Sequence, residues 1–396
     1  MNNEFESELS YILNELSEDR NEYFRAVAPP IMQTSNFAFT SVDGLRKSFE
    51  NEFNTWLYSR GLNPTVDILR KKLAALDGAE DCLVFSSGSA AIFASVLAVV
   101  KSGDHIVSVK GVYTWAQKVF DVVLPRFNIT TTYIDGTDIG NFRKATRENT
   151  TLYYLESPNS WTYELQDLRA VAALAREKNI LTICDNSYAT PLYQKPIDYG
   201  IDLVLQSATK YIGGHSDVIA GVLSGSTALI TKIFNSEYLA AGSGIQPFNA
   251  WLLIRGLRTL PIRMERITRT TREIVAYLKQ QTRVDGIIFP FDPDFPQYEL
   301  AKTQMKEACG LVTFFLKTQQ IETIEMFCDS LRHILMAVSW GGYESLIIPK
   351  CAGFKKEQFD PAIRDHRMLR LYIGLEDAPY LISDLESAFE SIAALP

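Results

Sequence analysis

The chain has 396 residues, of which 46% are hydrophobic and 22% charged, with a formal net charge of −8. This length and apolar content suffice for a large core and predict two or more domains. The acidic balance argues against nucleic acid or an anionic membrane surface as a partner.

The cysteines and histidines argue against a disulfide-bonded protein and against a metal-binding protein. The five cysteines are odd in number and form no C-x-x-C pair, and the four histidines lack metal-ligand spacing. Reduced thiols and no metal are therefore expected. The N-terminus is acidic and polar, without a secretory signal, and the longest apolar run, residues 90–100, is too short to cross a bilayer. We expect a cytoplasmic protein that does not associate with membranes.

Residues 1–60 show no alternation of strands and helices. An amphipathic opening with Leu9, Ile12, Leu13 and Leu16 leads into the Pro29-Pro30 pair, which breaks regular structure. Such an arm cannot form a core of its own, so we predict that it contributes to a neighbouring subunit.

Residues 61–255 alternate between short apolar runs and helical periods. We predict strands at 82–85, 105–109, 130–134, 152–155, 180–184 and 201–205, and helices at 66–76, 90–100, 115–124 and 168–178. This rhythm predicts a large α/β domain with a mainly parallel sheet between layers of helices.

A break at residues 256–261 precedes a long predicted helix over 262–282. A strand at 310–316 and helices at 322–331 and 378–394 follow. Residues 256–396 are therefore predicted to form a smaller α+β domain.

Two neighbouring strands end in polar residues. Asp185 follows the first, and the second leads into Ser207-Ala208-Thr209-Lys210. Ligands of α/β sheets bind beyond the carboxyl ends of strands. An aspartate and a lysine there suit pyridoxal phosphate (PLP), because the amine can bond to the aldehyde and the carboxylate can keep the pyridine nitrogen protonated. Taken singly, a surface lysine and a capping aspartate are commoner explanations, but the Ser207 and Thr209 hydroxyls are also spaced to reach a phosphate.

Residues 207–217, Ser-Ala-Thr-Lys-Tyr-Ile-Gly-Gly-His-Ser-Asp, resemble the PLP-lysine signature of the Cys/Met-metabolism (trans-sulfuration) enzymes. The resemblance extends from about residue 25 to the C-terminus. It implies the fold-type I PLP-dependent transferase fold, with a seven-stranded-type sheet between helices. It also implies PLP bound to Lys210 and held by Asp185, a small amino-acid substrate, and a homotetramer built from two dimers.

Two further segments gain a role from this resemblance. Gly88 and Ser89 lie in a strand-to-helix loop of small residues, where free N–H groups favour an anion, although an ordinary turn has the same appearance. The matching family loop holds the PLP phosphate. Tyr113 matches the tyrosine that stacks on the pyridine ring and assists proton transfer, although Thr114 replaces the glycine that many relatives have next.

The segment Tyr58-Ser59-Arg60-Gly61-Leu62-Asn63-Pro64-Thr65 resembles a family motif whose tyrosine and arginine reach the PLP phosphate of the neighbouring subunit. Arginine suits this role because its planar fork binds phosphate through two hydrogen bonds. The resemblance therefore implies that Tyr58 and Arg60 complete an active site shared between subunits.

Arg370 lies within an apolar strand, Leu369-Arg370-Leu371-Tyr372. A buried arginine requires an anion, either an acidic residue of the chain or a ligand. The resemblance implies that Arg370 binds the α-carboxylate of the substrate.

The segment Ser339-Trp340-Gly341-Gly342-Tyr343-Glu344-Ser345-Leu346 resembles the bacterial cystathionine β-lyase branch. It implies that Ser339, Trp340 and Tyr343 bind the substrate. The 156–161 loop lacks the Asn-Pro pair of many γ-acting relatives, which leaves Asn159 or Ser160 as the partner of the pyridine 3′-oxygen.

These motifs together predict a PLP-dependent carbon–sulfur β-lyase of methionine biosynthesis and cysteine metabolism, which cleaves L-cystathionine to homocysteine, pyruvate and ammonia. Lys210 is expected to take the Cα proton, and Lys210 or Tyr113 to protonate the leaving sulfur. The alternative is a γ-acting relative, namely cystathionine γ-synthase, cystathionine γ-lyase or an O-acyl-homoserine sulfhydrylase. A PLP-binding regulator without turnover is a second alternative.

Overall fold

The computed structural model describes residues 3–395, so Met1, Asn2 and Pro396 of the predicted arm and C-terminal domain lie outside the described residues. The chain divides into two compact units. The first comprises the described residues up to Asn159, together with Glu164–Gly213 and Asp217–Thr259. The second comprises Ser160–Tyr163, Gly214–Ser216 and the described residues from Leu260 onward.

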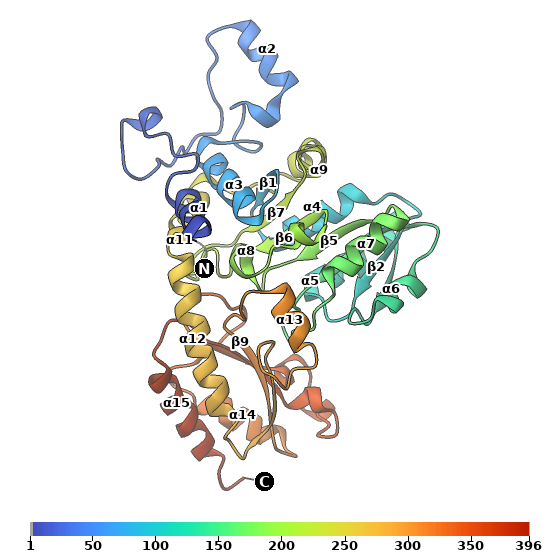
Figure 1. The fold of residues 1–396 in the computed structure, drawn as a ribbon, viewed down its shortest axis with the longest axis vertical. Helices are drawn as coiled ribbons and strands as arrows, with labels where there is room; N and C mark the ends of the chain where they lie inside the picture. Colours follow the sequence, from blue (N-terminus) through green and yellow to red (C-terminus); the bar gives the residue numbers. More distant parts are fainter. Residues whose placement is uncertain (1–2, 396) are drawn as a thin grey trace. The chain divides into compact units, whose positions relative to one another are not determined.

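The first unit is built on a mixed seven-stranded sheet (Figure 1). Its strands are β1 (Asp81–Phe85), β2 (His105–Val109), β3 (Thr130–Ile134), β4 (Thr150–Glu156), β5 (Leu181–Asp185), β6 (Leu203–Ser207) and β7 (Gly221–Gly225). The spatial order is β1-β7-β6-β5-β4-β2-β3, and only β7 runs antiparallel to its neighbours. Every residue of β2 and β7 is buried. Because successive side chains point to opposite faces, both faces of the sheet are covered there.

Helices follow most of these strands, as the alternating pattern predicts. The first unit contains the helices α1 (Asn3–Asn14), α2 (Val42–Glu50), α3 (Pro64–Asp77), α4 (Gly88–Val99), α5 (Thr114–Lys118), α6 (Ile139–Ala145), α7 (Leu168–Lys178), α8 (Thr190–Tyr193), α9 (Thr227–Ile233), α10 (Leu239–Ala241) and α11 (Pro247–Arg258), of which the first three precede β1. Local sequence sets their ends. Asn63 caps α3, Pro64 occupies its first turn, and Gly78 closes it in the left-handed conformation.

The predicted helix over 115–124 is interrupted. It begins as α5, continues through a π-helical turn over Val119–Val123, and tightens into a 3₁₀ turn over Leu124–Phe127. Pro125 lies at the start of that last turn, where its missing N–H leaves no hydrogen bond unmade.

The N-terminal helix packs on its own chain. Lys72 of α3 is fully buried and donates hydrogen bonds to the carbonyl oxygens of Ile12 (2.8 Å) and Leu13 (3.2 Å). It also pairs with the buried Glu18 carboxylate at 3.1 Å, and Arg258 of α11 binds both oxygens of that carboxylate at 3.0 Å. We call Lys72, Glu18 and Arg258 the buried charge cluster. The contribution of residues 1–60 to a neighbouring subunit stays a prediction. Phe24, Val27, Val42 and Phe49 are strongly exposed apolar residues of this segment.

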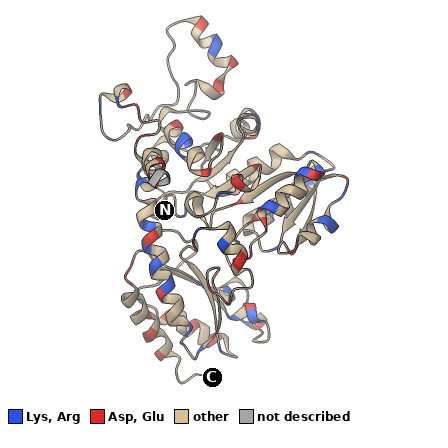
Figure 2. Ribbon diagram, in the orientation of Figure 1, with Lys and Arg blue, Asp and Glu red and all other residues tan. Residues whose placement is uncertain are grey.

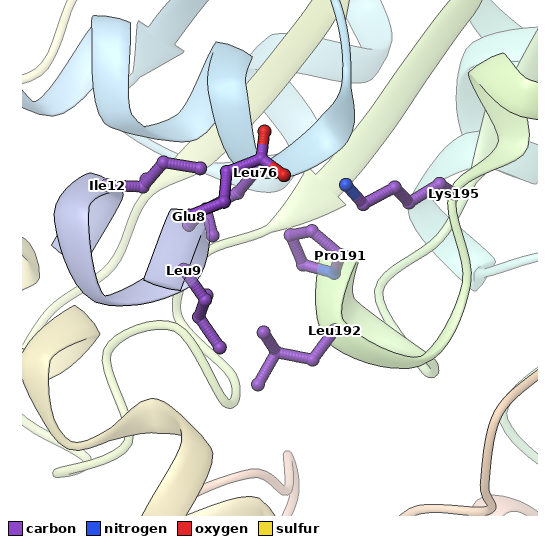
Figure 3. A pocket seen from close by; sticks show the side chains of 7 residues that line it. All are labelled: Glu8, Leu9, Ile12, Leu76, Pro191, Leu192 and Lys195. Atoms are coloured by element: carbon purple, nitrogen blue, oxygen red, sulfur yellow. The ribbon is translucent and has the colours of Figure 1, made fainter. Parts of the chain in front are cut away.

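A small apolar hollow lies where α1 meets α3 and the segment around α8 (Figure 3). Leu9 and Ile12 face Leu76, Pro191 and Leu192 across it, with Glu8 and Lys195 at its rim. None of the predicted site residues lines it, and we assign it only a packing role.

The second unit contains a five-stranded sheet in the order β10-β11-β12-β9-β8. The strands are β8 (Val284–Ile288), β9 (Leu311–Leu316), β10 (Leu335–Met336), β11 (Leu346–Pro349) and β12 (Met368–Tyr372). The helices are α12 (Leu260–Leu278), α13 (Tyr298–Gln304), α14 (Ile321–Ser330) and α15 (Ala378–Ser391). Apolar residues of α12, α14 and α15 pack with those of β9, β11 and β12 into a separate core.

Acidic and basic residues are interspersed along the helices of both units (Figure 2). All five cysteines are buried free thiols. Between residues 3 and 395, no helix combines the length and the apolar character that crossing a membrane requires.

One buried carboxyl group gives the fold a pH dependence. Asp77, at the end of α3, accepts hydrogen bonds from Gln206 Nε2 and Ser224 Oγ, both at 2.6 Å. Burial raises the pKa of Asp77 to about 7. Between its ordinary pKa and this raised value the folded chain holds a proton that the unfolded chain has released, so stability falls as pH rises through this window.

We therefore expect the wild type to lose on the order of 2–3 kcal/mol relative to Asp77→Asn between pH 5 and pH 8. Asparagine keeps the shape, and Ser224 can accept from its amide. Urea unfolding of both proteins at the two pH values measures this difference. A stability difference that does not change with pH would show that Asp77 is ionised in both states.

Candidate active site

The predicted cofactor residues other than Tyr58 and Arg60 lie at one edge of the seven-stranded sheet. Strands β1, β4, β5 and β6 run in the same direction, so their carboxyl ends share that edge. The antiparallel β7 begins there, with Gly221 in register with both Ser207 and Phe85. The ends of distant segments are thereby brought together in the first unit.

The loop after β1 packs directly against its neighbours. A Cβ atom on Gly221 would lie 2.3 Å from the carbonyl oxygen of Ser87, so any side chain there forces the loop away. A Cβ atom on Gly88 would lie 3.3 Å from the Ser207 Cβ atom. Ser87 caps α4 by accepting the Ala90 N–H at 3.0 Å. The other N–H groups of this first turn have no partner within the helix and can bind an anion.

Asp185 is a buried carboxylate at the end of β5. Its Oδ1 atom accepts the Ser187 N–H at 2.9 Å. Burial raises the pKa of Asp185, whereas the Ser187 hydrogen bonds and the positive charge of Lys210 oppose that rise. A cationic ring nitrogen at this carboxylate would likewise favour its ionised form.

Ser187 connects this carboxylate to the next strand end. Its hydroxyl oxygen accepts the Ser207 N–H at 2.7 Å, and the Ser207 carbonyl accepts the Lys210 N–H at 3.1 Å. The Thr209 hydroxyl donates to the Ala220 carbonyl (3.2 Å) and accepts the Ala220 N–H (3.0 Å). The lysine segment is thus fixed by backbone contacts on both sides.

Tyr113 lies close to the same loop. Its hydroxyl lies near Ser89, which lowers the phenol pKa and so partly opposes the effect of burial, and its backbone N–H donates to Glu156 at 2.6 Å. The side chain is half exposed, and its partial burial raises the pKa of the phenol. At neutral pH Tyr113 therefore keeps a proton that it can donate.

Tyr58 and Arg60 are both exposed and contact each other, with the guanidinium carbon 5.6 Å from the centre of the tyrosine ring. Their predicted role at the phosphate of a neighbouring subunit stays a proposal.

The first unit offers the chemical groups that PLP requires. Free N–H groups and small residues suit a phosphate, Asp185 suits a protonated ring nitrogen, and Lys210 offers an amine on the adjoining segment. The sequence analysis missed Gly221, Ser187 and Glu156. Of these, only Gly221 could have been recognised from the sequence, because it is a glycine at the start of an apolar run.

A second group of residues surrounds Arg370 in the second unit. Arg370 is buried in β12 and donates to the carbonyl oxygens of Ser160 (3.1 Å) and Ser339 (3.4 Å). Its guanidinium carbon lies 4.8 Å from the centre of the Trp161 ring. These carbonyls and the ring orient the guanidinium, whose planar fork suits a carboxylate.

The predicted substrate segment lies next to Arg370. Ser339 adopts a positive φ of 80°, which turns its carbonyl toward Arg370. Trp340 is buried, whereas Tyr343 is exposed. The segment is tied down because the Gly342 carbonyl accepts the Tyr372 hydroxyl at 2.6 Å.

The two candidate partners of the pyridine 3′-oxygen differ in their contacts. The Asn159 side chain is buried and donates weakly to Glu164 at 3.4 Å. Ser160 contributes its carbonyl to Arg370.

The α/β fold and the candidate cofactor residues are those expected of a PLP-dependent enzyme. Residues 11–390 match the Cys/Met metabolism PLP-dependent enzymes, and the chain belongs to this family, whose cofactor is PLP. The chain is 38% identical to L-methionine gamma-lyase of Treponema denticola over 381 residues, which is 94% of each chain. It is 33% identical to cystathionine gamma-lyase of Bacillus subtilis over 372 residues, or 93% of this chain and 95% of that protein.

A solved structure shares the whole fold. The crystal structure of cystathionine gamma synthase from Xanthomonas oryzae pv. oryzae in complex with aminoacrylate and cysteine has a TM-score of 0.90 and 31% identity. The match covers 98% of this chain and 99% of that one.

We expect Lys210→Ala to lose both covalent cofactor and turnover, because Lys210 supplies the amine on the segment fixed beside Asp185. Borohydride reduction followed by peptide mass spectrometry should place the cofactor mass on the Lys210 peptide of the wild type only. Lys195→Ala, at the rim of the apolar hollow, is the matched control and should keep the label. Cofactor found on another lysine of the wild type would refute the assignment.

We expect Gly221→Ala to weaken PLP binding by roughly tenfold or more, since overpacking at this contact displaces the loop. Equilibrium dialysis of PLP against both proteins provides the measurement. Gly353→Ala is the control, because a Cβ atom there meets nothing within 4 Å. Unchanged PLP affinity in Gly221→Ala would show that the loop does not hold the cofactor.

Proposed function

We propose that this enzyme cleaves the Cγ–S bond of a sulfur amino acid, releasing a thiol, 2-oxobutyrate and ammonia. The observation that carries this proposal is the set of relatives. Methionine γ-lyases, a cystathionine γ-lyase and cystathionine γ-synthases match 93% or more of the chain at 32–38% identity. They favour the γ-acting alternative over the β-lyase that the 339–346 segment predicts.

The residues of the chain have separate tasks in this proposal. Bound PLP supplies an electron sink for the substrate Cα atom. The Asp185 carboxylate keeps the ring nitrogen protonated. Arg370 binds the α-carboxylate of the substrate and thereby orients it. The Lys210 amine accepts a proton from carbon, and Tyr113 donates its phenolic proton to the departing sulfur.

β-Elimination is the second candidate, and specific residues favour it. Trp340 and Tyr343 match the β-lyase form of their segment, and Thr114 replaces the glycine after Tyr113. The same Lys210, Asp185 and Arg370 would serve this reaction, because fold and cofactor do not fix which bond breaks.

The products of L-cystathionine distinguish the two candidates. We expect cysteine, 2-oxobutyrate and ammonia when the PLP-loaded protein is incubated with it, and 2-oxobutyrate with methanethiol from L-methionine. Mass spectrometry of the keto acid suffices. Pyruvate with homocysteine would establish the β-lyase instead, and the absence of any keto acid from either substrate would direct attention to homoserine esters and then to a PLP-binding regulator.

We further propose that two subunits share each active site. Tyr58 and Arg60 are exposed on a segment with several exposed apolar side chains, which suits burial against a partner. The family resemblance assigns this pair to the phosphate of the neighbouring subunit, in a homotetramer built from such dimers.

Mixing two inactive variants tests this sharing. Arg60→Ala and Lys210→Ala should each be inactive alone, whereas refolding them together should restore about a quarter of wild-type sites, because each mixed dimer contains one intact site. Keto-acid production by the mixture gives the result. No recovery, despite mixed dimers seen by native mass spectrometry, would place Arg60 and Lys210 in the same chain's site.

A further inference from the structure

Glu156, the last residue of β4, binds the backbone of Tyr113. Its Oε2 atom accepts the Tyr113 N–H at 2.6 Å, and the glutamate is buried. So short an N–H···O distance is typical of a bond to a carboxylate. Tyr113 carries the proposed proton donor, whereas Glu156 has no task in the reaction described above.

This hydrogen bond completes the start of α5. Tyr113 precedes the first turn of that helix, and its own side chain makes no capping hydrogen bond. In a capping box, the side chain of the third helical residue accepts the N–H of the capping residue. The third helical residue here is Ala116, which is buried and has no side-chain acceptor. Glu156 therefore supplies from strand β4 a contact that the helix cannot make with its own third residue.

Tyr113 is thereby held on both sides of its Cα atom. Its N–H donates to Glu156, and its carbonyl oxygen accepts the Gln117 N–H at 3.1 Å. Because peptide groups are planar, fixing both of them also fixes the direction of the Cα–Cβ bond. The ring is half exposed, so packing alone does not fix it, and the backbone contacts help to set where the phenol lies.

The loop before Tyr113 runs along the end of the same strand. Gly111 has a positive φ of 74°, a conformation that favours glycine. A Cβ atom there would lie 3.7 Å from Asn159 Nδ2, so the loop contacts the segment that follows β4. The Lys110 N–H donates to the Ile134 carbonyl oxygen at 2.8 Å. The loop is therefore bound to the end of β3 at its start and to the end of β4 at Tyr113.

Strand β4 also fixes Glu156 relative to Asp185. The two residues are in register at the ends of the parallel strands β4 and β5. The Ser157 N–H donates to the Asp185 carbonyl oxygen at 3.3 Å, which extends this pairing by one residue. Burial raises the pKa of the Tyr113 phenol, and the negative charges of Asp185 and Glu156 add to that rise. The sheet thus sets the position of Tyr113 relative to Asp185, although Tyr113 belongs to a loop.

We propose that Glu156 is a positioning residue for proton donation by Tyr113. Its carboxylate fixes the Tyr113 backbone to the end of β4, which gives the phenol one place relative to Asp185. Glu156 acts through Tyr113 and takes no part in the proton transfer itself. The inference rests on the proposed role of Tyr113 as donor to the departing sulfur, and it applies to β- and γ-elimination alike.

Two substitutions separate the hydrogen bond from the size of the side chain. Glu156→Met keeps the length but has only a weak acceptor, whereas Glu156→Gln keeps a carbonyl oxygen for the Tyr113 N–H. We expect kcat for the cleaved sulfur amino acid to fall roughly tenfold in Glu156→Met, with KM changed less than about twofold, because a misplaced general acid affects the transition state. Glu156→Gln should lose less than about threefold. Glu148→Ala, which removes an exposed carboxylate before β4, is the control.

Removing the phenol tests whether Glu156 acts through it. We expect Tyr113→Phe to lower kcat at least roughly tenfold, and Glu156→Met to lower it less than about twofold further in the Tyr113→Phe background. A further loss of about tenfold in the double variant would show that Glu156 acts elsewhere. Equal losses in Glu156→Met and Glu156→Gln, or no loss in Glu156→Met, would also overturn the proposal.

Hydrogen exchange tests the backbone contact without turnover. In the PLP-loaded wild type without substrate, the Tyr113 amide should exchange at least roughly tenfold more slowly than the Trp115 amide, which lies in the first turn of α5 and has no acceptor within the helix. Mass spectrometry with single-residue fragmentation gives both rates. Glu156→Gln should keep this protection and Glu156→Met should lose it.

The exchange rates also separate this inference from the proposed function. If no sulfur amino acid is cleaved, the proposed function fails, and the exchange rates still decide whether Glu156 holds Tyr113. Equal exchange of the Tyr113 and Trp115 amides in the wild type would refute the positioning role.

Discussion

The candidate cofactor site depends on one close backbone contact, the approach of strand β7 to the loop after β1. Only the hydrogen of Gly221 fits beside the Ser87 carbonyl. The same strand is in register with β6, so this contact fixes Gly88 against Ser207. The candidate phosphate-binding turn and the lysine segment, which are far apart in sequence, thereby become neighbours.

Much of this arrangement could be predicted from the sequence. The parallel strands are covered on both faces and therefore read as continuous apolar runs, and their polar ends identified Asp185 and Lys210. Strand β7 was missed because it begins and ends with glycine, which is rare within strands. Its antiparallel direction, and with it the roles of Gly221 and Ser187, depends on pairing between distant segments, which local patterns do not encode.

The reaction was harder to predict than the cofactor. PLP requires particular groups at particular strand ends, and those groups are visible in one sequence. Which bond of the substrate breaks depends instead on how the substrate is held beyond Cα. There, only a few residues distinguish β-acting from γ-acting enzymes. The 339–346 segment favours β-elimination, whereas the relatives favour γ-chemistry. Trp161 became noticeable only when the fold placed it beside Arg370.

The buried charge cluster has a consequence for how the chain tolerates cleavage. Lys72 is fully shielded from solvent and depends on Glu18 and on two carbonyl groups of the N-terminal segment. The loop that follows Glu18 exposes Phe24 and Val27. A protease that nicks this loop would leave α1 attached, since its departure would break the ion pairs of Glu18 with Lys72 and Arg258. The nicked fragment would separate only in denaturant, and the protein would still behave as one body in solution.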